Sequence, residues 1–275
     1  MTSGLTYNTN TPAFEKARQL TDGKMDTVTV IKCLAQDPLS FEPGEKWVYS
    51  LSHDVLGAVV EVISGKKFRD YVKENIFLPL DMQESCFHND SVQDRMAQQY
   101  QSADFTEDDL SRLRSGTGGD VMDGITNVGK NVVGHVFGSE YDSGGAGITT
   151  SVPDYSKFVS ALANGGVGSN GERILSSRTI DLMRSDQLKG QPRADYECPA
   201  LKGYSYGLGV RTLINVAQSG SFGSVGEFGW GGAAGANTLV DPKLKLSMFY
   251  AQHVLNPQDC HYQPDIRKAL YASLG

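Results

Sequence analysis

The spacing of apolar residues changes along the chain, and this change restricts the fold more than any other feature of the sequence. Through the first two thirds, apolar residues recur at helical spacing, most clearly over 54–64, where Gly65 follows as a C-cap. Beyond Gly203, short apolar stretches joined by glycine-rich and Asp-Pro turns predict strands. Helices followed by antiparallel strands are the order of an α+β fold. We therefore expect a mostly helical lobe over 1–190 and an antiparallel β segment with a C-terminal helix over 191–275.

Individual elements follow from the same patterns. The helix over 54–64 is predicted to be amphipathic, because one face carries its apolar residues Val55, Leu56, Val59, Val60 and Ile63. Ser151 precedes Asp154 by three residues, which is the pattern of a helix N-terminus. Further helices are expected over 28–34, 68–77, 178–183 and 264–274, and strands over 206–213, 228–231, 236–240 and 244–252.

Charge and hydropathy exclude several classes of partner. The 275 residues carry a formal net charge of −7, and the isoelectric point is near 5.2. Phosphate binding needs clustered Lys and Arg, so we expect no nucleic-acid partner. No apolar run approaches the roughly 20 residues that a membrane-spanning helix needs. A small neutral or mildly polar substrate fits this composition better.

The cysteines and histidines show no metal-ligand spacing. The four cysteines are far apart and are expected to be reduced, structural thiols: Cys33, Cys86, Cys198 and Cys260. Structural roles are also expected for the five histidines His53, His88, His135, His253 and His261. We therefore expect neither a metal nor a cofactor.

Four segments occur in an order that is typical of one family. They are Thr2-Ser-Gly-Leu-Thr-Tyr7, Pro43-Gly-Glu-Lys-Trp-Val-Tyr49-Ser50, Ser143-Gly-Gly-Ala-Gly-Ile148 and Gly229-Trp-Gly-Gly-Ala-Ala-Gly235. In these segments the chain resembles serine hydrolases of the β-lactamase and penicillin-binding-protein-like superfamily. It looks closest to the class C-like branch, which includes esterases, D-aminopeptidases and transesterases. The resemblance implies a β-lactamase/transpeptidase-like fold and an acyl-enzyme mechanism on an ester, amide or β-lactam.

The resemblance also assigns roles to residues. Tyr49 matches the tyrosine that acts as general base, and Trp230-Gly231-Gly232 stands where other members have Lys-Thr-Gly or His-Thr-Gly. We expect the Ala233 N–H to be one oxyanion-hole donor, with the N–H of the attacking serine as the other. A tyrosine hydroxyl in water has a pKa of about 10, so its ionisation at pH 7 requires about 4 kcal/mol unless a cation lies nearby. In the family, the lysine of a Ser-x-x-Lys motif is that cation.

Two departures from the family pattern bear on the substrate. The Tyr-x-Asn motif reads Tyr49-Ser50-Leu51, so Leu51 occupies the position of an amide that contacts a β-lactam side chain. Trp230 replaces the cation of Lys-Thr-Gly and removes a partner for the β-lactam carboxylate. Both changes favour an esterase-like or other acyl-transfer substrate over a β-lactam, although Trp230 also suits the core of a strand.

The nucleophile is the missing part. Ser64-Gly-Lys-Lys67 matches Ser-x-x-Lys literally, but Ser64 is expected to end a helix, whereas catalysis needs the serine at a helix start. The family places its motif upstream of the Thr2–Tyr7 segment. We therefore expect an N-terminal truncation that removes the early strands and the Ser-x-x-Lys helix.

Several hypotheses remain open from the sequence. The first is a serine hydrolase whose nucleophile segment is absent from this chain. The alternative is a catalytically inactive fragment or pseudoenzyme that works as a binding or interaction module. A thiol hydrolase using Cys198 or Cys260 is a third. An exposed sheet edge is expected to allow self-association. The compartment stays unknown, with the cytoplasm as the default.

Overall fold

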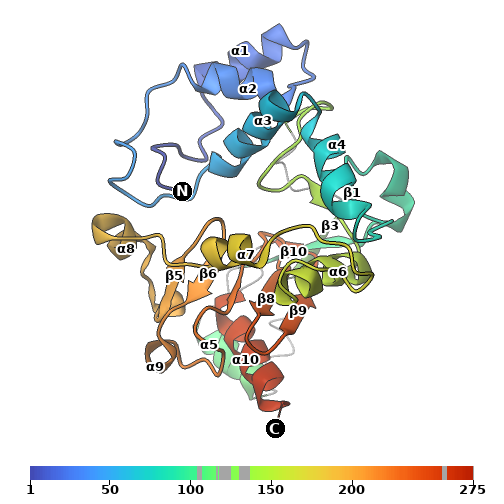
Figure 1. The fold of residues 1–275 in the computed structure, drawn as a ribbon. Coiled ribbons are helices and arrows are strands. Elements are labelled where there is room, and N and C mark those ends of the chain that lie inside the picture. The colour runs from blue at the N-terminus through green and yellow to red at the C-terminus, as the bar shows by residue number, and fades with distance from the viewer. Residues whose placement is uncertain (104–106, 116, 118–124, 130–136, 256–258, 275) are drawn as a thin grey trace.

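The computed structural model of the chain describes residues 1–103, 107–115, 117, 125–129, 137–255 and 259–274. It has the mixed α+β content expected from the sequence. Four helices gather at one end of the molecule (Figure 1): α1 (Pro12–Leu20), α2 (Thr27–Leu34), α3 (Ser52–Ser64) and α4 (Phe68–Val72), which continues as a π-helix over Lys73–Phe77. The largest sheet and the C-terminal helix α10 (Asp259–Ala272) lie at the other end.

The large sheet is antiparallel, with the strand order β5-β6-β7-β8-β9. The strands are β5 (Tyr204–Tyr206), β6 (Arg211–Leu213), β7 (Phe228–Gly229), β8 (Asn237–Asp241) and β9 (Leu246–Tyr250). The single strand expected over 206–213 is therefore a hairpin. Gly209 has a φ of +85° in its turn, a conformation that glycine adopts without a steric penalty.

The remaining elements are short or connect the two ends. The helices are α5 (Glu107–Arg114), α6 (Val152–Ala163), α7 (Ser177–Met183), α8 (Gly190–Tyr196), α9 (Val216–Ser219) and two 3₁₀ helices over Asp90–Arg95 and Pro199–Leu201. The small strands are β1 (Cys86–Phe87), β2 (Gln99–Ser102), β3 (Ile125–Gly129), β4 (Ile148–Thr149) and β10 (Val254–Leu255). The sequence left 104–137 unassigned, and much of that stretch lies outside the described residues.

The expected boundary near residue 190 does not separate two sets of contacts. Helix α6 belongs to the expected helical lobe, yet it packs against β8 and β9 of the sheet. Strand β10 pairs in parallel with β2, which comes from the first half of the chain. The order of elements followed from the sequence, whereas their packing crosses the expected boundary.

Helix α3 begins and ends close to the predicted positions. Gly65 is left-handed with a φ of 70°, and its N–H donates to the Glu61 carbonyl at 2.9 Å. Its apolar face is largely open to solvent, since Leu56 is 58% exposed and Ile63 is 81% exposed. Asp54 and Glu61 are buried instead, and both have polar partners there.

The helical end has its own core around the start of α3. Its buried residues come from α1, α2, the segment between them, the start of α3 and the loop before β4, and they are Ala13, Phe14, Ala17, Met25, Val30, Cys33, Leu34, Leu51 and Tyr141. Among the described residues, no helix is long and apolar enough to cross a bilayer.

Candidate active site

The loop that carries Tyr49 runs beside the first residues of the chain. The Gly44 N–H donates to the Thr2 carbonyl at 2.8 Å, and the Val48 N–H donates to the Met1 carbonyl at 3.0 Å. Gly4 has a φ of +86°, and a Cβ there would lie 2.4 Å from the Phe41 carbonyl oxygen. Two of the four segments noted in the sequence are therefore neighbours, and they fix the position of Tyr49 immediately before α3.

Tyr49 is sandwiched between two aromatic rings. Its ring stacks on Tyr7 at 5.3 Å between centroids and on Trp230 at 6.0 Å, with interplanar angles of 17° and 10°. The Tyr49 side chain is still 44% exposed, and its hydroxyl has no hydrogen-bond partner among the described residues. The structure thus brings together Tyr49 and Trp230, two residues that the sequence singled out, and leaves the phenol open to a reactant.

The stack belongs to a larger group, here called the aromatic cluster, which consists of Tyr7, Trp47, Tyr49, Tyr196, Tyr206 and Trp230. Trp47 Nε1 and the hydroxyls of Tyr196 and Tyr206 are buried without a hydrogen-bond partner in the part of the chain that is described. A buried unpaired polar group typically costs about 1–3 kcal/mol. Buried polar groups without a partner are uncommon in folded proteins, and a role in a functional site is one explanation for them.

The segment after β7 holds the other expected site residues. The Trp230 carbonyl accepts from the Thr238 N–H at 2.9 Å, and Gly231 forms a bridge with Asn237. Gly232 donates to the Ala236 carbonyl at 2.7 Å, so its N–H is not available to a ligand. Ala233 lies in the exposed turn that follows, and its N–H has no partner among the described residues. An N–H of this kind can donate to a developing oxyanion.

Leu51 is not a substrate contact. Its side chain is 1% exposed and lies in the core of the helical end, so the expectation that Leu51 lines the substrate site is corrected. Tyr49 precedes Leu51 by two residues, and the chain enters the first turn of α3 between them. The two side chains therefore point to different environments, one open and one packed.

We expect Leu51→Ala to lower the free energy of unfolding by at least about 2 kcal/mol, because it removes a fully packed side chain from the core. Leu56→Ala is the matched control on the same helix, and its exposed side chain should change stability by less than about 0.5 kcal/mol. Urea unfolding followed by circular dichroism measures both. Equal losses for the two variants would contradict the burial described here.

The Ser143-Gly-Gly segment is fastened to the start of α3. Asp54 Oδ1 accepts from the Ser143 hydroxyl at 2.7 Å and from the Tyr141 hydroxyl at 3.0 Å. A Cβ on Gly144 would lie 2.1 Å from the His53 carbonyl oxygen, and one on Gly145 would lie 3.1 Å from the Tyr7 hydroxyl. The glycines are therefore required by the close approach of this loop to α3 and to the aromatic cluster.

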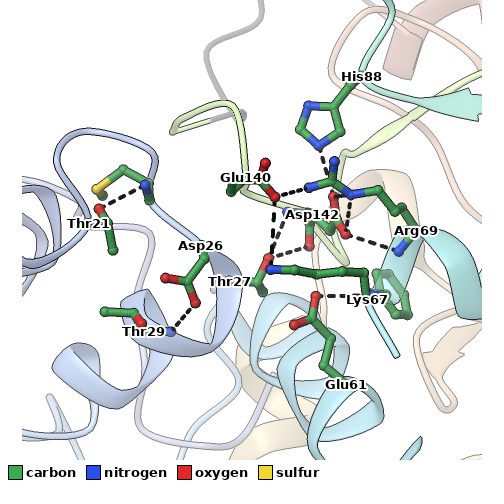
Figure 2. A network of polar contacts seen from close by, with 12 residues as sticks. Thr21, Asp26, Thr27, Thr29, Glu61, Lys67, Arg69, His88, Glu140 and Asp142 are labelled. Atoms are coloured by element: carbon green, nitrogen blue, oxygen red, sulfur yellow. Dashed lines mark hydrogen bonds and ion pairs between the residues drawn. The ribbon is translucent and has the colours of Figure 1, made fainter. Parts of the chain in front are cut away.

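A buried polar network holds the residue before Ser143. Figure 2 shows Asp142 at the centre, with Arg69 and His88 pointing toward its carboxylate. Arg69 donates to Asp142 from its main-chain N–H at 3.0 Å and from Nε at 2.9 Å, and His88 Nε2 lies 2.9 Å from Oδ1. The Asp142 N–H donates to Thr27 Oγ1 at 2.7 Å. This network ties the Ser143 loop to α2 and α4.

The Ser64-Gly-Lys-Lys67 match has the environment of a helix end. Ser64 is the last residue of α3, and its hydroxyl accepts from the Lys66 N–H at 3.2 Å. Lys66 pairs with Glu74, and Lys67 lies 4.0 Å from Glu140. The helix rises about 1.5 Å per residue, which places Ser64 roughly 18 Å from the end of α3 that adjoins Tyr49. The prediction that Ser64 ends a helix is confirmed.

The cysteines and histidines form no described metal cluster. Cys33 is buried, Cys86 is half-buried and Cys198 is exposed, and all three are unpaired. His88 contacts Asp142, and His253 Nδ1 lies 3.0 Å from the Ala97 carbonyl. Within the described ranges, no three His, Cys, Asp or Glu residues are grouped as a metal site. The side chains of His135, Cys260 and His261 lie outside the described residues.

Three further side chains adjoin the site and were not expected there from the sequence: His53, Tyr7 and Tyr206. His53 lines a cavity of about 460 Å³ next to the aromatic cluster, and Tyr206 forms part of the same wall. Burial, with smaller effects from Tyr49 and Asp54, raises the pKa of Tyr7 to about 12. No motif marks these residues. Tyr7 stands inside the first segment noted above, and that position was the only sequence signal for it.

Comparisons with known proteins show which family the chain resembles. The chain matches the model of the Beta-lactamase family over residues 1–272. It is 31% identical over 220 residues to esterase EstB of Burkholderia gladioli, and the match covers 79% of the chain and 52% of EstB. It is 26% identical over 288 residues to lovastatin esterase of Penicillium rubens, covering 97% of the chain and 65% of that esterase.

A solved structure shows the same fold. EstCE1, a hydrolase with promiscuous acyltransferase activity, superimposes with a TM-score of 0.71 at 24% identity, and the match covers 98% of the chain and 69% of EstCE1. The chain spans 59% of a relative from Mycobacterium tuberculosis and 52% of EstB, so it accounts for little more than half the length of these curated relatives.

Proposed function

The chain belongs to the Beta-lactamase family, and from this premise we propose that it supplies the general base and one oxyanion-hole donor of a serine hydrolase. This hydrolase acts on esters through an acyl-enzyme. The proposal rests on the Tyr49 hydroxyl, which has no hydrogen-bond partner among the described residues. The Tyr49 ring is held in place by stacking on Tyr7 and Trp230. The unpaired N–H of Ala233 on the neighbouring turn supports the proposal.

The proposed reaction has two steps, acylation of the serine and hydrolysis of the acyl-enzyme. Tyr49, as phenolate, takes the proton of an attacking serine while the serine oxygen forms a bond to the substrate carbonyl carbon. The Ala233 N–H donates to the carbonyl oxygen as it becomes negative. The leaving alcohol departs with a proton from Tyr49, and a water molecule then releases the acyl group by the same route. A cation beside Tyr49 is needed to favour the phenolate.

The attacking serine is proposed to come from outside these 275 residues. Ser-x-x-Lys occurs in the sequence only at Ser64, and that serine stands at the far end of α3. The lysine of the same motif is the cation that the mechanism requires. This part of the proposal rests on the motif and on the position of Ser64.

Esters are favoured over β-lactams and peptides as substrates. Trp230 offers a stacking surface and no positive charge, so the site has no fixed partner there for a substrate carboxylate. Two of the relatives, EstB and lovastatin esterase, are named as esterases.

A direct assay tests the proposal. The 275-residue chain should hydrolyse p-nitrophenyl acetate and a chromogenic cephalosporin no faster than buffer. A polypeptide that adds a Ser-x-x-Lys segment from the same coding region should hydrolyse the acetate and should become labelled on that serine by a fluorophosphonate. Rapid turnover by the chain itself that Ser64→Ala abolishes would overturn the assignment of the nucleophile.

A second candidate is a binding module without catalysis, favoured by the position of Ser64 at the wrong end of α3. It predicts that no polypeptide containing residues 1–275 reacts with the fluorophosphonate, while small esters still bind. Labelling of any serine in such a polypeptide contradicts it.

We also propose that the chain self-associates through strand β9, which ends the order of the large sheet. The Thr238 N–H donates to Trp230 on the β7 side, so by the alternation of antiparallel pairing Leu239 faces β9. The main-chain groups of Ser247 and Phe249 then point away from β8, and no described strand pairs with them. Strand β9 contains no charged residue and no proline, the features that commonly protect an edge.

We expect sedimentation velocity to show a dimer that forms as the concentration of the chain rises. Ser247→Pro removes an outward N–H without removing a bond to β8, so it should weaken the dimer. Ser247→Ala keeps the N–H and is the control. Unchanged association of the Ser247→Pro chain would place the contact elsewhere.

A further inference from the structure

The cavity beside the aromatic cluster has the size and walls of a small-molecule site. Its volume of about 460 Å³ lies within the roughly 300–1,000 Å³ that is usual for such sites. The walls include the apolar residues Trp47, Leu56, Leu188, Pro192, Tyr206 and Leu208. Trp47 and Tyr206 also contact Tyr49 and Trp230, respectively, so the cavity adjoins the site described above.

Three ring side chains of this wall have polar atoms without a partner among the described residues. Trp47 Nε1 and the Tyr206 hydroxyl are buried, whereas His53 is only partly buried. It stands in the first turn of α3, and its imidazole has no hydrogen bond or ion pair among the described residues. The neighbouring wall residue Ser52 differs, because its hydroxyl is bonded to those of Ser50 at 2.7 Å and Ser3 at 2.9 Å. A Cβ on Gly209 would lie 3.1 Å from His53 Nε2, so the hairpin turn closes over this histidine.

The imidazole is expected to be neutral. Burial, followed by the positive charge of the Met1 amine, lowers the pKa of His53, while the nearby carboxylate of Asp54 acts in the opposite direction. A neutral imidazole has one donor and one acceptor nitrogen. It can therefore bind an uncharged oxygen, such as a ketone, ether, hydroxyl or second ester.

We propose that this cavity binds an apolar, uncharged group that carries an oxygen, and that His53 forms the hydrogen bond to that oxygen. The identification of this group as part of an ester substrate rests on the proposed function, whereas the binding itself does not. The substrate class is then esters whose acyl or alcohol part is an aryl or branched apolar group with a second oxygen. His53 and the apolar walls would determine specificity, and Tyr49 would remain the base.

A pair of probes that differ in one atom group tests the proposal on the unmodified chain. Acetophenone has a carbonyl oxygen where α-methylstyrene has a methylene group, and the two have nearly the same shape. The chain has two tryptophans, Trp47 in the cavity wall and Trp230 beside it, so their fluorescence reports binding. We expect acetophenone to bind about fivefold more tightly than α-methylstyrene, the gain of one net hydrogen bond.

Two variants assign that preference to His53. His53→Leu should bind both probes with equal affinity, whereas His53→Gln, which keeps a donor and an acceptor, should retain the preference. Thermal unfolding checks that each variant is folded. Equal binding of the two probes to the unmodified chain overturns the proposal, as does a preference that survives in folded His53→Leu.

Sodium benzoate and the esterase assay separate the remaining outcomes. If benzoate binds more tightly than acetophenone, the exposed Lys189 at the cavity binds anions. This result would overturn the proposal that the ligand is uncharged. If the probes bind as expected but no polypeptide containing the chain is labelled by a fluorophosphonate, the proposed function fails and the binding site stands. If labelling occurs and the probes bind equally, the proposed function stands and the inference about this cavity fails.

Discussion

Replacing Tyr49 by phenylalanine should lower kcat for ester hydrolysis by about 10²–10⁴-fold in a polypeptide that carries residues 1–275 together with the attacking serine. The substitution removes the hydroxyl that is proposed as the base and keeps the ring that stacks on Tyr7 and Trp230. Because that hydroxyl has no partner in the described part of the chain, its loss should leave the thermal unfolding temperature unchanged. Hydrolysis of p-nitrophenyl acetate measures the rate.

Tyr204→Phe is the control for Tyr49→Phe. Tyr204 is a buried tyrosine of β5 that lies under the Arg211 guanidinium, 4.9 Å from it, and it is not part of the cavity wall. Its loss of a hydroxyl should leave kcat within about twofold of the unmodified protein. If Tyr49→Phe retains full activity, tyrosine is not the base and the proposed mechanism is wrong.

Asp142→Ala should lower the free energy of unfolding by about 3 kcal/mol. Asp142 is fully buried and accepts from both Arg69 and His88, so its removal leaves buried donors without a partner. The side chain of Arg69 is 26% exposed and still pairs with Glu140 at 3.1 Å after the substitution. The expected loss of stability therefore lies at the low end of the range for breaking a buried ion pair. Urea unfolding at neutral pH measures the change.

Asp81→Ala is the matched control for Asp142→Ala. Asp81 also pairs with a basic side chain, Lys157, at 3.4 Å, but its carboxylate is solvated. Exposed ion pairs stabilise proteins little, but Asp81 has a φ of 54°, which alanine adopts less readily than aspartate, so a loss of no more than about a third of that for Asp142→Ala is expected. Equal losses for Asp81→Ala and Asp142→Ala would show that the network of Figure 2 is no stronger than a surface pair.

Local signals in the sequence were sufficient to find most elements. Gly65 was expected to end the helix over 54–64, and it does so in the left-handed conformation that glycine tolerates. Ser151 was expected to cap the next long helix, and its hydroxyl accepts from the Asp154 N–H. Caps involve residues within one turn of each other, so sequence spacing is enough to predict them. The hairpin of β5 and β6 was missed because its turn contains few residues and interrupts an apolar run.

The candidate site was only partly accessible from the sequence. The segments that contain Tyr49 and Trp230 were recognised by their order, and the structure stacks the two rings. The burial of Leu51 could not be read from its position beside Tyr49, because neighbouring residues at a helix start point in different directions. His53 gave no signal, since a cavity wall is assembled from segments far apart in the chain.

The sequence by itself determined the α+β order, the helix ends and the absence of a Ser-x-x-Lys motif at a helix start. These properties depend on residue type and on spacing within a few positions. Only the tertiary structure decided which face of α3 is buried, because polar partners from the Tyr141–Ser143 loop and Phe68 hold the Asp54 and Glu61 side inward and leave Leu56 and Ile63 exposed. It also decided that Tyr49, Trp230 and the cavity wall meet, since long-range contacts bring these segments together.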